Sequence, residues 1–162
     1  FGKGEVFLPE LIMAAEAMKE GTEVILPYVP KGKEIRGLGR ILIGTVRGDL
    51  HDIGKSIVGA MFEASGFEVI DLGVDVPTQK FVEKVKELKP DIVGLSALLT
   101  TTLPEMERVI DALRKAGLRG KIKVMVGGAP VTQEFADKIG ADARGADAVE
   151  ATEKAKKLLG IE

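Results

Sequence analysis

The stretch with the most distinctive chemistry surrounds His51, the only histidine in the chain. Residues 48–55 read Gly-Asp-Leu-His-Asp-Ile-Gly-Lys, with an apolar run before them at 41–46 and a helical pattern after them. Asp49 lies two residues before His51, so in an extended loop the two side chains point the same way. A carboxylate that binds one imidazole nitrogen fixes the tautomer and leaves the other nitrogen free for a metal. The spacing therefore indicates His51 as a candidate metal ligand, oriented by Asp49.

A single histidine limits the kind of metal site that the chain could build. A closed zinc site takes about four protein ligands, and this chain has no cysteine. A metal bound at His51 would therefore draw most of its ligands from elsewhere. A metal that is already held in a macrocycle and needs one axial ligand fits that limit. The alternative is an ordinary polar pair on a surface loop, with no ligand.

From Arg40 onward the sequence alternates between strand and helix patterns, which must position this loop. Valine, isoleucine and leucine dominate the strand patterns, as in buried parallel strands. The alternation predicts an α/β fold: a Rossmann-like (flavodoxin-like) doubly wound, parallel five-stranded sheet in the order 2-1-3-4-5. In that order the loops carrying His51 and Ser96 face each other across the ligand-binding crevice. Strands are predicted at 41–46, 67–72, 91–97, 122–127 and 141–143, and helices at 54–65, 77–88, 103–116, 131–139 and 147–159.

Small and hydroxyl-bearing residues gather at the ends of the first, third and fourth strands. Gly94 interrupts an apolar strand, which often marks the close approach of a ligand or of another backbone. Together these residues indicate a deep slot with a few hydrogen-bond donors. The alternative is that they are ordinary turn and cap residues, with Thr102 as the N-cap of a helix that starts near Pro104. The set is Gly54, Gly94, Ser96, Thr100, Thr102, Gly127, Gly128 and Ala129.

Three of these stretches, in order, resemble the motifs of corrinoid-binding domains. Residues 49–54 match Asp-x-His-x-x-Gly, residues 94–102 resemble the Ser-x-Leu-x-Thr segment, and residues 127–129 resemble the Gly-Gly turn. The similarity extends over about residues 40 to 160 and part of the helical segment before them. The chain is most similar to the methyltransferase branch, which includes the cobalamin module of methionine synthase. That branch also holds the corrinoid proteins of methanol, methylamine and methoxyaromatic methyltransferases.

The resemblance implies a corrinoid cofactor, cobalamin or a related cobamide, with His51 replacing the cofactor's own base as the lower cobalt ligand. It implies that Ser96 and Thr100 contact the displaced nucleotide tail. Thr102 would hydrogen-bond near the Asp49–His51 pair, where methionine synthases often have serine. The implied cofactor-binding residues are Asp49, Leu50, His51, Asp52, Ile53, Gly54, Ser96, Leu98, Thr100, Thr102, Gly127, Gly128, Ala129 and Ala146.

Two other classes of protein fit the motifs less well. Cobalamin-dependent mutases carry arginine within Asp-x-His-x-Arg-Gly, and here that position is Ile53. A phosphate-binding Walker loop would need four residues between its glycines, whereas five separate Gly48 from Gly54. The first comparison disfavours the mutase branch, and the second disfavours nucleotide binding.

The first 30 residues are predicted to be part of a helical cap domain, and residues 31–39 a flexible linker rich in glycine and charge. Pro9 suits a helix start, and Gly21 is predicted to end that helix. In the family, apolar cap residues cover the methyl-bearing face of the corrin. The candidates here are Phe7, Leu8, Leu11 and Ile12, with ordinary helix packing as the alternative. Residues 40–162 form the predicted corrinoid-binding domain, and the absence of an initial methionine suggests a segment before Phe1.

Composition narrows the classes of partner. The net charge of −2 argues against nucleic acid, which selects strongly basic faces. No apolar run approaches the roughly 18 residues of a membrane span. The lack of cysteine rules out disulfides and thiol catalysis, and is consistent with a cytoplasmic protein.

We therefore expect a corrinoid protein that carries a methyl group on cobalt and is not catalytic alone. Its expected partners are a substrate-specific methyltransferase and a methyl-acceptor methyltransferase, with a reductive activator as a third. A cobalamin-binding sensor that regulates a partner is the alternative from a different class.

Overall fold

The computed structural model describes residues 37–161, together with isolated positions between residues 7 and 24. Most of the predicted cap and linker therefore lies outside the described residues, including Leu8, Leu11 and Ile12. Phe7 is described and is exposed. Gly21 is itself helical, but Thr22 and Glu23 lie outside the described residues, so a helix end at Gly21 stays a prediction.

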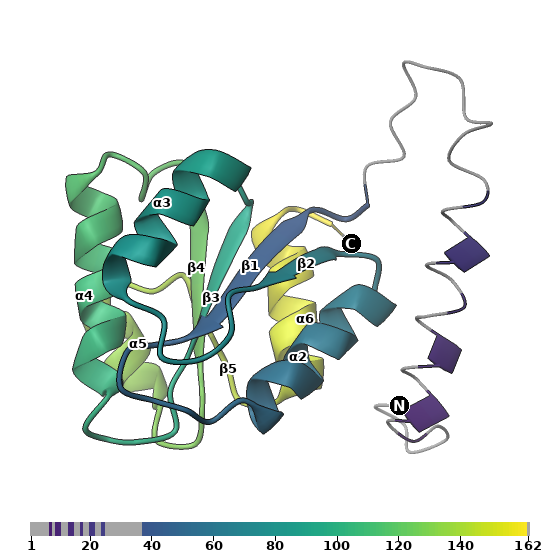
Figure 1. Cartoon of the computed structure of the whole chain (residues 1–162), viewed down its shortest axis with the longest axis horizontal. Coiled ribbons are helices and arrows are strands. Elements are labelled where there is room, and N and C mark those ends of the chain that lie inside the picture. The colour runs from purple at the N-terminus through teal and green to yellow at the C-terminus, as the bar shows by residue number, and fades with distance from the viewer. Residues whose placement is uncertain are drawn as a thin grey trace.

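Residues 40–158 form a parallel five-stranded sheet whose strands alternate with helices (Figure 1). The strand order is β2-β1-β3-β4-β5, which confirms the predicted topology. Helices α2 and α6 cover one face of the sheet and α3, α4 and α5 the other (Figure 1). The strands are β1 (Arg40–Thr45), β2 (Glu68–Asp71), β3 (Ile92–Ser96), β4 (Lys123–Gly127) and β5 (Ala143–Gly145). The helices are α2 (Ile53–Ala64), α3 (Thr78–Leu88), α4 (Leu103–Lys115), α5 (Gln133–Ile139) and α6 (Ala148–Leu158).

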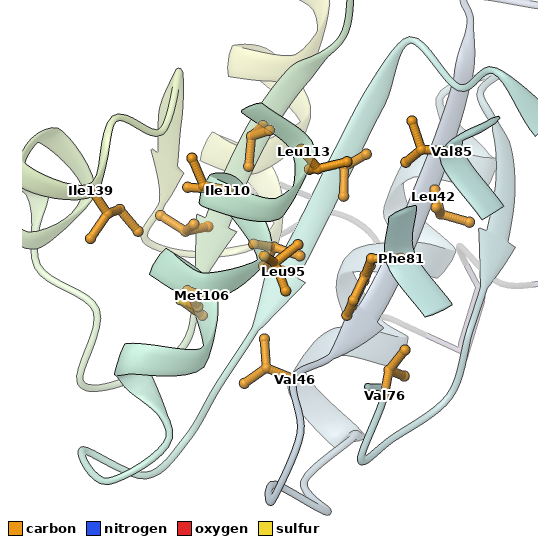
Figure 2. Packing of buried hydrophobic residues seen from close by; sticks show 14 of the residues in the cluster. Leu42, Val46, Val76, Phe81, Val85, Leu95, Met106, Ile110, Leu113 and Ile139 are labelled. Carbon is orange, nitrogen blue, oxygen red and sulfur yellow. The ribbon is translucent and has the colours of Figure 1, made fainter. Parts of the chain in front are cut away.

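The two faces of the sheet are filled unequally. Successive residues of a strand point to opposite faces, so Leu42 packs under α3 while Ile41 and Ile43 face α2 and α6. The larger core lies beneath α3, α4 and α5, where Phe81 and Met106 are fully buried (Figure 2). The core on the α2 and α6 side is smaller. This leaves space on that face near the carboxyl ends of the strands.

The fifth strand and helix α5 differ by two residues from their predicted bounds, and the other elements by at most one. The fifth strand spans Ala143–Gly145, not 141–143. The strand begins only after Asp142, because the side chain of Asp142 is bound to neighbouring residues. Its carboxylate accepts the N–H of Val124 at 2.6 Å and pairs with Arg119 at 2.9 Å. Helix α5 starts two residues later than predicted, because the hydroxyl of Thr132 caps it by accepting a backbone N–H at 3.1 Å.

Within the described part of the chain, no helix has the length and apolar character needed to cross a membrane.

Candidate cofactor site at the carboxyl edge of the sheet

Asp49 is fully buried in the loop between β1 and α2, and both of its carboxylate oxygens are used. Oδ1 accepts hydrogen bonds from Nδ1 of His51 at 2.7 Å and from the His51 backbone N–H at 3.1 Å. Oδ2 accepts from the backbone N–H groups of Leu98 at 2.8 Å and Leu99 at 3.2 Å. The Thr102 hydroxyl donates to the same oxygen at 2.8 Å. Asp49 therefore ties the His51 loop to the loop between β3 and α4.

This network sets the charge of Asp49 and the tautomer of His51. Burial alone would raise the pKa of Asp49, but the hydrogen bonds from His51, Leu98 and Thr102 outweigh it and hold that pKa well below its usual range. The carboxylate is therefore ionised and can only accept. Nδ1 of His51 must then carry a proton, which leaves the lone pair of the neutral imidazole on Nε2.

The imidazole of His51 is about half exposed, and Nε2 has no hydrogen-bond partner among the described residues. The backbone of His51 is also held in place, because the buried hydroxyl of Thr45 donates to the His51 carbonyl oxygen at 2.9 Å. The described residues include no group of three or more histidine, aspartate or glutamate side chains that could hold a metal ion. The site thus offers one oriented nitrogen, which fits a metal that brings its other ligands with it.

A pocket of about 610 Å³ opens beside His51, between the sheet and helices α2 and α6. Residues of the loops after β1, β3 and β4 line it, and these loops lie at the lower edge of the domain in Figure 1. Most of the residues that sequence reasoning singled out line this pocket. They are Leu50, His51, Asp52, Ile53, Gly54, Ser96, Leu98, Gly127, Gly128, Ala129 and Ala146.

The hollow arises from small residues that lie side by side on one face of the sheet. Ser96 is in register with Gly127, and Gly127 with Gly145, so three neighbouring strands end in small residues at one level. Residues two apart on a strand share a face, so Gly94 belongs to the same face as Ser96. Two residues further from the edge, Met125 lies between Gly94 and Ala143, and its bulky side chain lines the pocket. The strand ends therefore leave room that the strand centres do not.

The glycines at this edge have different reasons for lacking a side chain. At Gly54 an added Cβ would meet nothing within 4 Å, so this position faces open space at the pocket. Gly128 has φ of 131°, and its Cβ would overlap the carbonyl oxygen of Ala97. The backbone itself therefore requires glycine at this position, independently of any ligand, and Gly128 also lines the pocket.

Two threonines singled out from sequence lie outside the pocket. Thr100 is exposed in the loop before α4 and does not line it. Thr102 occupies the N-cap position of α4, as predicted, but makes no capping hydrogen bond with its side chain. Its hydroxyl donates instead to the ionised carboxylate of Asp49, and the carbonyl oxygen of Leu99 lies at the same distance of 2.8 Å.

Sequence reasoning missed a buried cation in the pocket wall. The Lys55 side chain is almost fully buried on α2 and forms an ion pair with Asp71 at the end of β2. The helical period could have predicted the burial of Lys55, because Lys55 lies four residues before Gly59 and seven before Phe62. It therefore shares the buried face of α2 with them.

Comparison with known proteins agrees with this geometry. Residues 39–154 match the model of the B12 binding domain family. Dimethylamine corrinoid protein 3 of Methanosarcina mazei is 54% identical over 159 residues, which cover 98% of this chain and 95% of that protein. The trimethylamine corrinoid protein of Methanosarcina barkeri is 52% identical over 162 residues, covering 99% of this chain and 75% of that protein.

A solved structure gives the same result. The crystal structure of the methanol:cobalamin methyltransferase complex MtaBC from Methanosarcina barkeri matches with a TM-score of 0.86 at 34% identity. The match covers 98% of this chain and 60% of that chain. The fold is that of a B12 binding domain. More particularly, the chain belongs to the family of methylamine corrinoid proteins of methyltransferase systems. The expectation of a methyl-carrying corrinoid protein is confirmed.

Proposed function

We propose that this chain is the corrinoid protein of a system that demethylates dimethylamine or trimethylamine. The observation that carries the proposal is the presentation of His51: Asp49 holds a proton on Nδ1, so the lone pair of Nε2 is free to accept a ligand beside an apolar pocket. The relatives at 54% and 52% identity support the choice of methylated amines. The chain's own part is to bind and orient the cofactor, while the cobalt of a bound corrinoid supplies the methyl-transfer chemistry.

The residues of the site divide this work among them. His51 would hold cobalt from the lower side, and the slot beside Ser96 and Gly127 would take the nucleotide tail of a cobamide. The pocket volume of about 610 Å³ is of the size that proteins use for small ligands and cofactors, roughly 300–1,000 Å³. Leu50 and Ile53 are exposed although large and apolar, and both line the pocket. Such side chains would exclude water from a flat apolar macrocycle.

The carrier role requires more than one protein partner. We propose a methyltransferase specific for the methylated amine, a second methyltransferase for the acceptor, and a reductive activator. The MtaBC complex of a relative supports the first of these. We further propose that residues 1–30 cover the methyl-bearing face and that the linker at 31–39 lets them move aside.

Turnover by the isolated chain tests this proposal. Holo-protein reduced to the Co(I) state should react with methyl iodide but leave dimethylamine and trimethylamine unchanged. Adding the cognate methyltransferase should start demethylation, and His51→Ala should slow it while Glu107→Gln, an exposed change on α4, should not. Sustained demethylation by the isolated chain would overturn the carrier role. Corrinoid binding with no methyl transfer to or from any methyltransferase would favour the sensor.

A further inference from the structure

Asp75, in the loop between β2 and α3, contacts the loop that carries Asp49 and His51 at two points. Its carboxylate Oδ1 accepts the backbone N–H of Gly48 at 2.6 Å. Its own backbone N–H donates to the carbonyl oxygen of Asp49 at 2.9 Å. Asp75 has φ of 50°, a left-handed conformation that few residues other than glycine adopt but that aspartate and asparagine tolerate. The chain therefore uses an unusual backbone conformation to make both contacts with one residue.

The contact with Gly48 selects one form of a turn. Residues 46–49 form a β-turn, closed by the Asp49 N–H donating to the Val46 carbonyl at 3.2 Å. Gly48 has φ of 79°, the value for the third residue of a type II turn. Type I and type II turns differ in the orientation of the central peptide, here between Arg47 and Gly48, so the Gly48 N–H points differently in each. By accepting that N–H, Asp75 favours the type II form.

The turn places Asp49, and Asp49 places His51. On the side of the third strand, Leu98, Leu99 and Thr102 hold only the carboxylate of Asp49. On the side of the second strand, Asp75 holds its backbone. Both ends of Asp49 must be fixed for its 2.7 Å hydrogen bond to fix the imidazole of His51.

We propose that Asp75 is a positioning residue that sets how firmly His51 can coordinate cobalt. The inference rests on the proposed function, because it takes His51 as the lower cobalt ligand. It concerns a residue of the β2–α3 loop that contacts neither the imidazole nor the pocket. Asp75 acts through Gly48 and Asp49. We therefore expect it to affect how firmly His51 coordinates cobalt, and not how much room the slot offers to the nucleotide tail.

Three substitutions of Asp75 separate its contributions. Asp75→Gly keeps the left-handed backbone and the N–H contact to Asp49 but removes the carboxylate. Asp75→Asn keeps an acceptor oxygen and tolerates the same backbone. Asp75→Glu keeps the charge but moves the oxygen by one methylene. The matched control is Lys89→Gly at the exposed C-terminus of α3, which places glycine at the other non-glycine residue with positive φ, 47°, in the described part of the chain.

Two readouts that do not depend on turnover decide the question. In the protein without corrinoid, nitrogen-15 NMR of the His51 ring reports the Nδ1–H bond to Asp49. In the protein loaded with cobalamin, electron paramagnetic resonance of Co(II) gives the fraction with His51 coordinated. Asp75→Gly and Asp75→Glu should shift the ring resonances. Both should weaken coordination by roughly threefold to tenfold, less than the ~10–100-fold usual for a ligand's direct partner. Asp75→Asn and Lys89→Gly should match the wild type.

The outcomes distinguish this inference from the proposed function. If the wild type shows His51 bound to Co(II) and Asp75→Gly and Asp75→Glu show the same fraction and the same ring resonances, Asp75 has no positioning role. If the wild type shows no His51 bound to Co(II), the proposed ligation itself is wrong, and the role of Asp75 in coordination is wrong with it. Loss of coordination in Lys89→Gly would assign the effect to glycine and overturn the inference as well.

Discussion

The imidazole of His51 and the carboxylate of Asp49 are joined by a 2.7 Å hydrogen bond, yet the first side chain is 51% exposed and the second 0%. The pair therefore runs from the interior to the surface, with its fixed end buried and its reactive end open to a ligand. The buried end is hydrogen-bonded to backbone N–H groups of a different loop, so the position of the imidazole depends on the packing of two loops.

Because His51 is the only histidine, nitrogen-15 labelling of histidine marks one residue. We expect untagged labelled protein, loaded with cobalamin in the Co(II) state, to show hyperfine coupling from the protein nitrogen. The cofactor's own base should show none, because His51 replaces it. His51→Ala should restore coupling from the cofactor's base or leave cobalt with neither. Coupling from the cofactor's base alone in the wild type would contradict His51 ligation.

Replacing Asp49 should change stability in a way that depends on pH. The pKa of Asp49 is lowered in the folded protein, so its ionised form stabilises the fold above its ordinary pKa of about 3.9. That stabilising contribution is lost as the pH falls from about 3.9 toward the lowered pKa of Asp49. Asp49→Asn should therefore cost about 2 kcal/mol at pH 7, and the difference from the wild type should shrink below about pH 4. Urea unfolding at several pH values measures it, and a constant difference would contradict the lowered pKa.

The ion pair between Lys55 and Asp71 should respond unequally to loss of either partner. The side chain of Lys55 is 4% exposed and that of Asp71 39%. Asp71→Ala leaves a buried cation without its partner and should cost about 3 kcal/mol, whereas Lys55→Met leaves a carboxylate that water can reach. Urea unfolding should therefore rank Asp71→Ala as the less stable variant. The exposed pair of Lys84 and Glu87 is the control, and its loss should cost less than ~1 kcal/mol.

The adjacent residues Gly127 and Gly128 should respond differently to replacement by alanine. Gly127→Ala would place Cβ 3.4 Å from the Gly145 carbonyl oxygen, with no positive φ to oppose it, and should narrow the slot without unfolding the protein. Gly128→Ala should destabilise the fold, because its Cβ would overlap the Ala97 backbone. We expect Gly127→Ala to weaken binding of complete cobalamin more than binding of cobinamide, which lacks the nucleotide tail. Calorimetry with both ligands measures this, and equal weakening would contradict a tail site at Gly127.

Much of the fold follows from the sequence because buried parallel strands and amphipathic helices leave strong periodic signals. The strand order and the meeting of the His51 and Ser96 loops then follow from the doubly wound topology that the alternation of strands and helices favours. The fifth strand is only three residues long, and its start is set by the side chain of Asp142, so periodicity could not place it.

The site was less accessible to such reasoning where a role depends on distant contacts. The hydroxyl of Thr102 could cap a helix or bond to Asp49, and only the folded loop decides between them. Asp75 gives no pattern at all, because its partners Gly48 and Asp49 lie more than 25 positions away in the chain.

The unequal packing on the two faces of the sheet has a consequence for how readily the protein unfolds locally and is degraded. The side of α2 and α6 holds a hollow where the opposite side holds packed side chains. A ligand that fills this hollow becomes part of the interior, and at a free concentration 100 times its Kd it adds about 2.7 kcal/mol of stability. We therefore expect amides of α2 and α6 to exchange with solvent faster than those of α3 and α4 until the hollow is filled. The exchange rates of α2 and α6 would then show whether the ligand is bound. We expect the protein without ligand to unfold first at these helices and to be cut there by proteases.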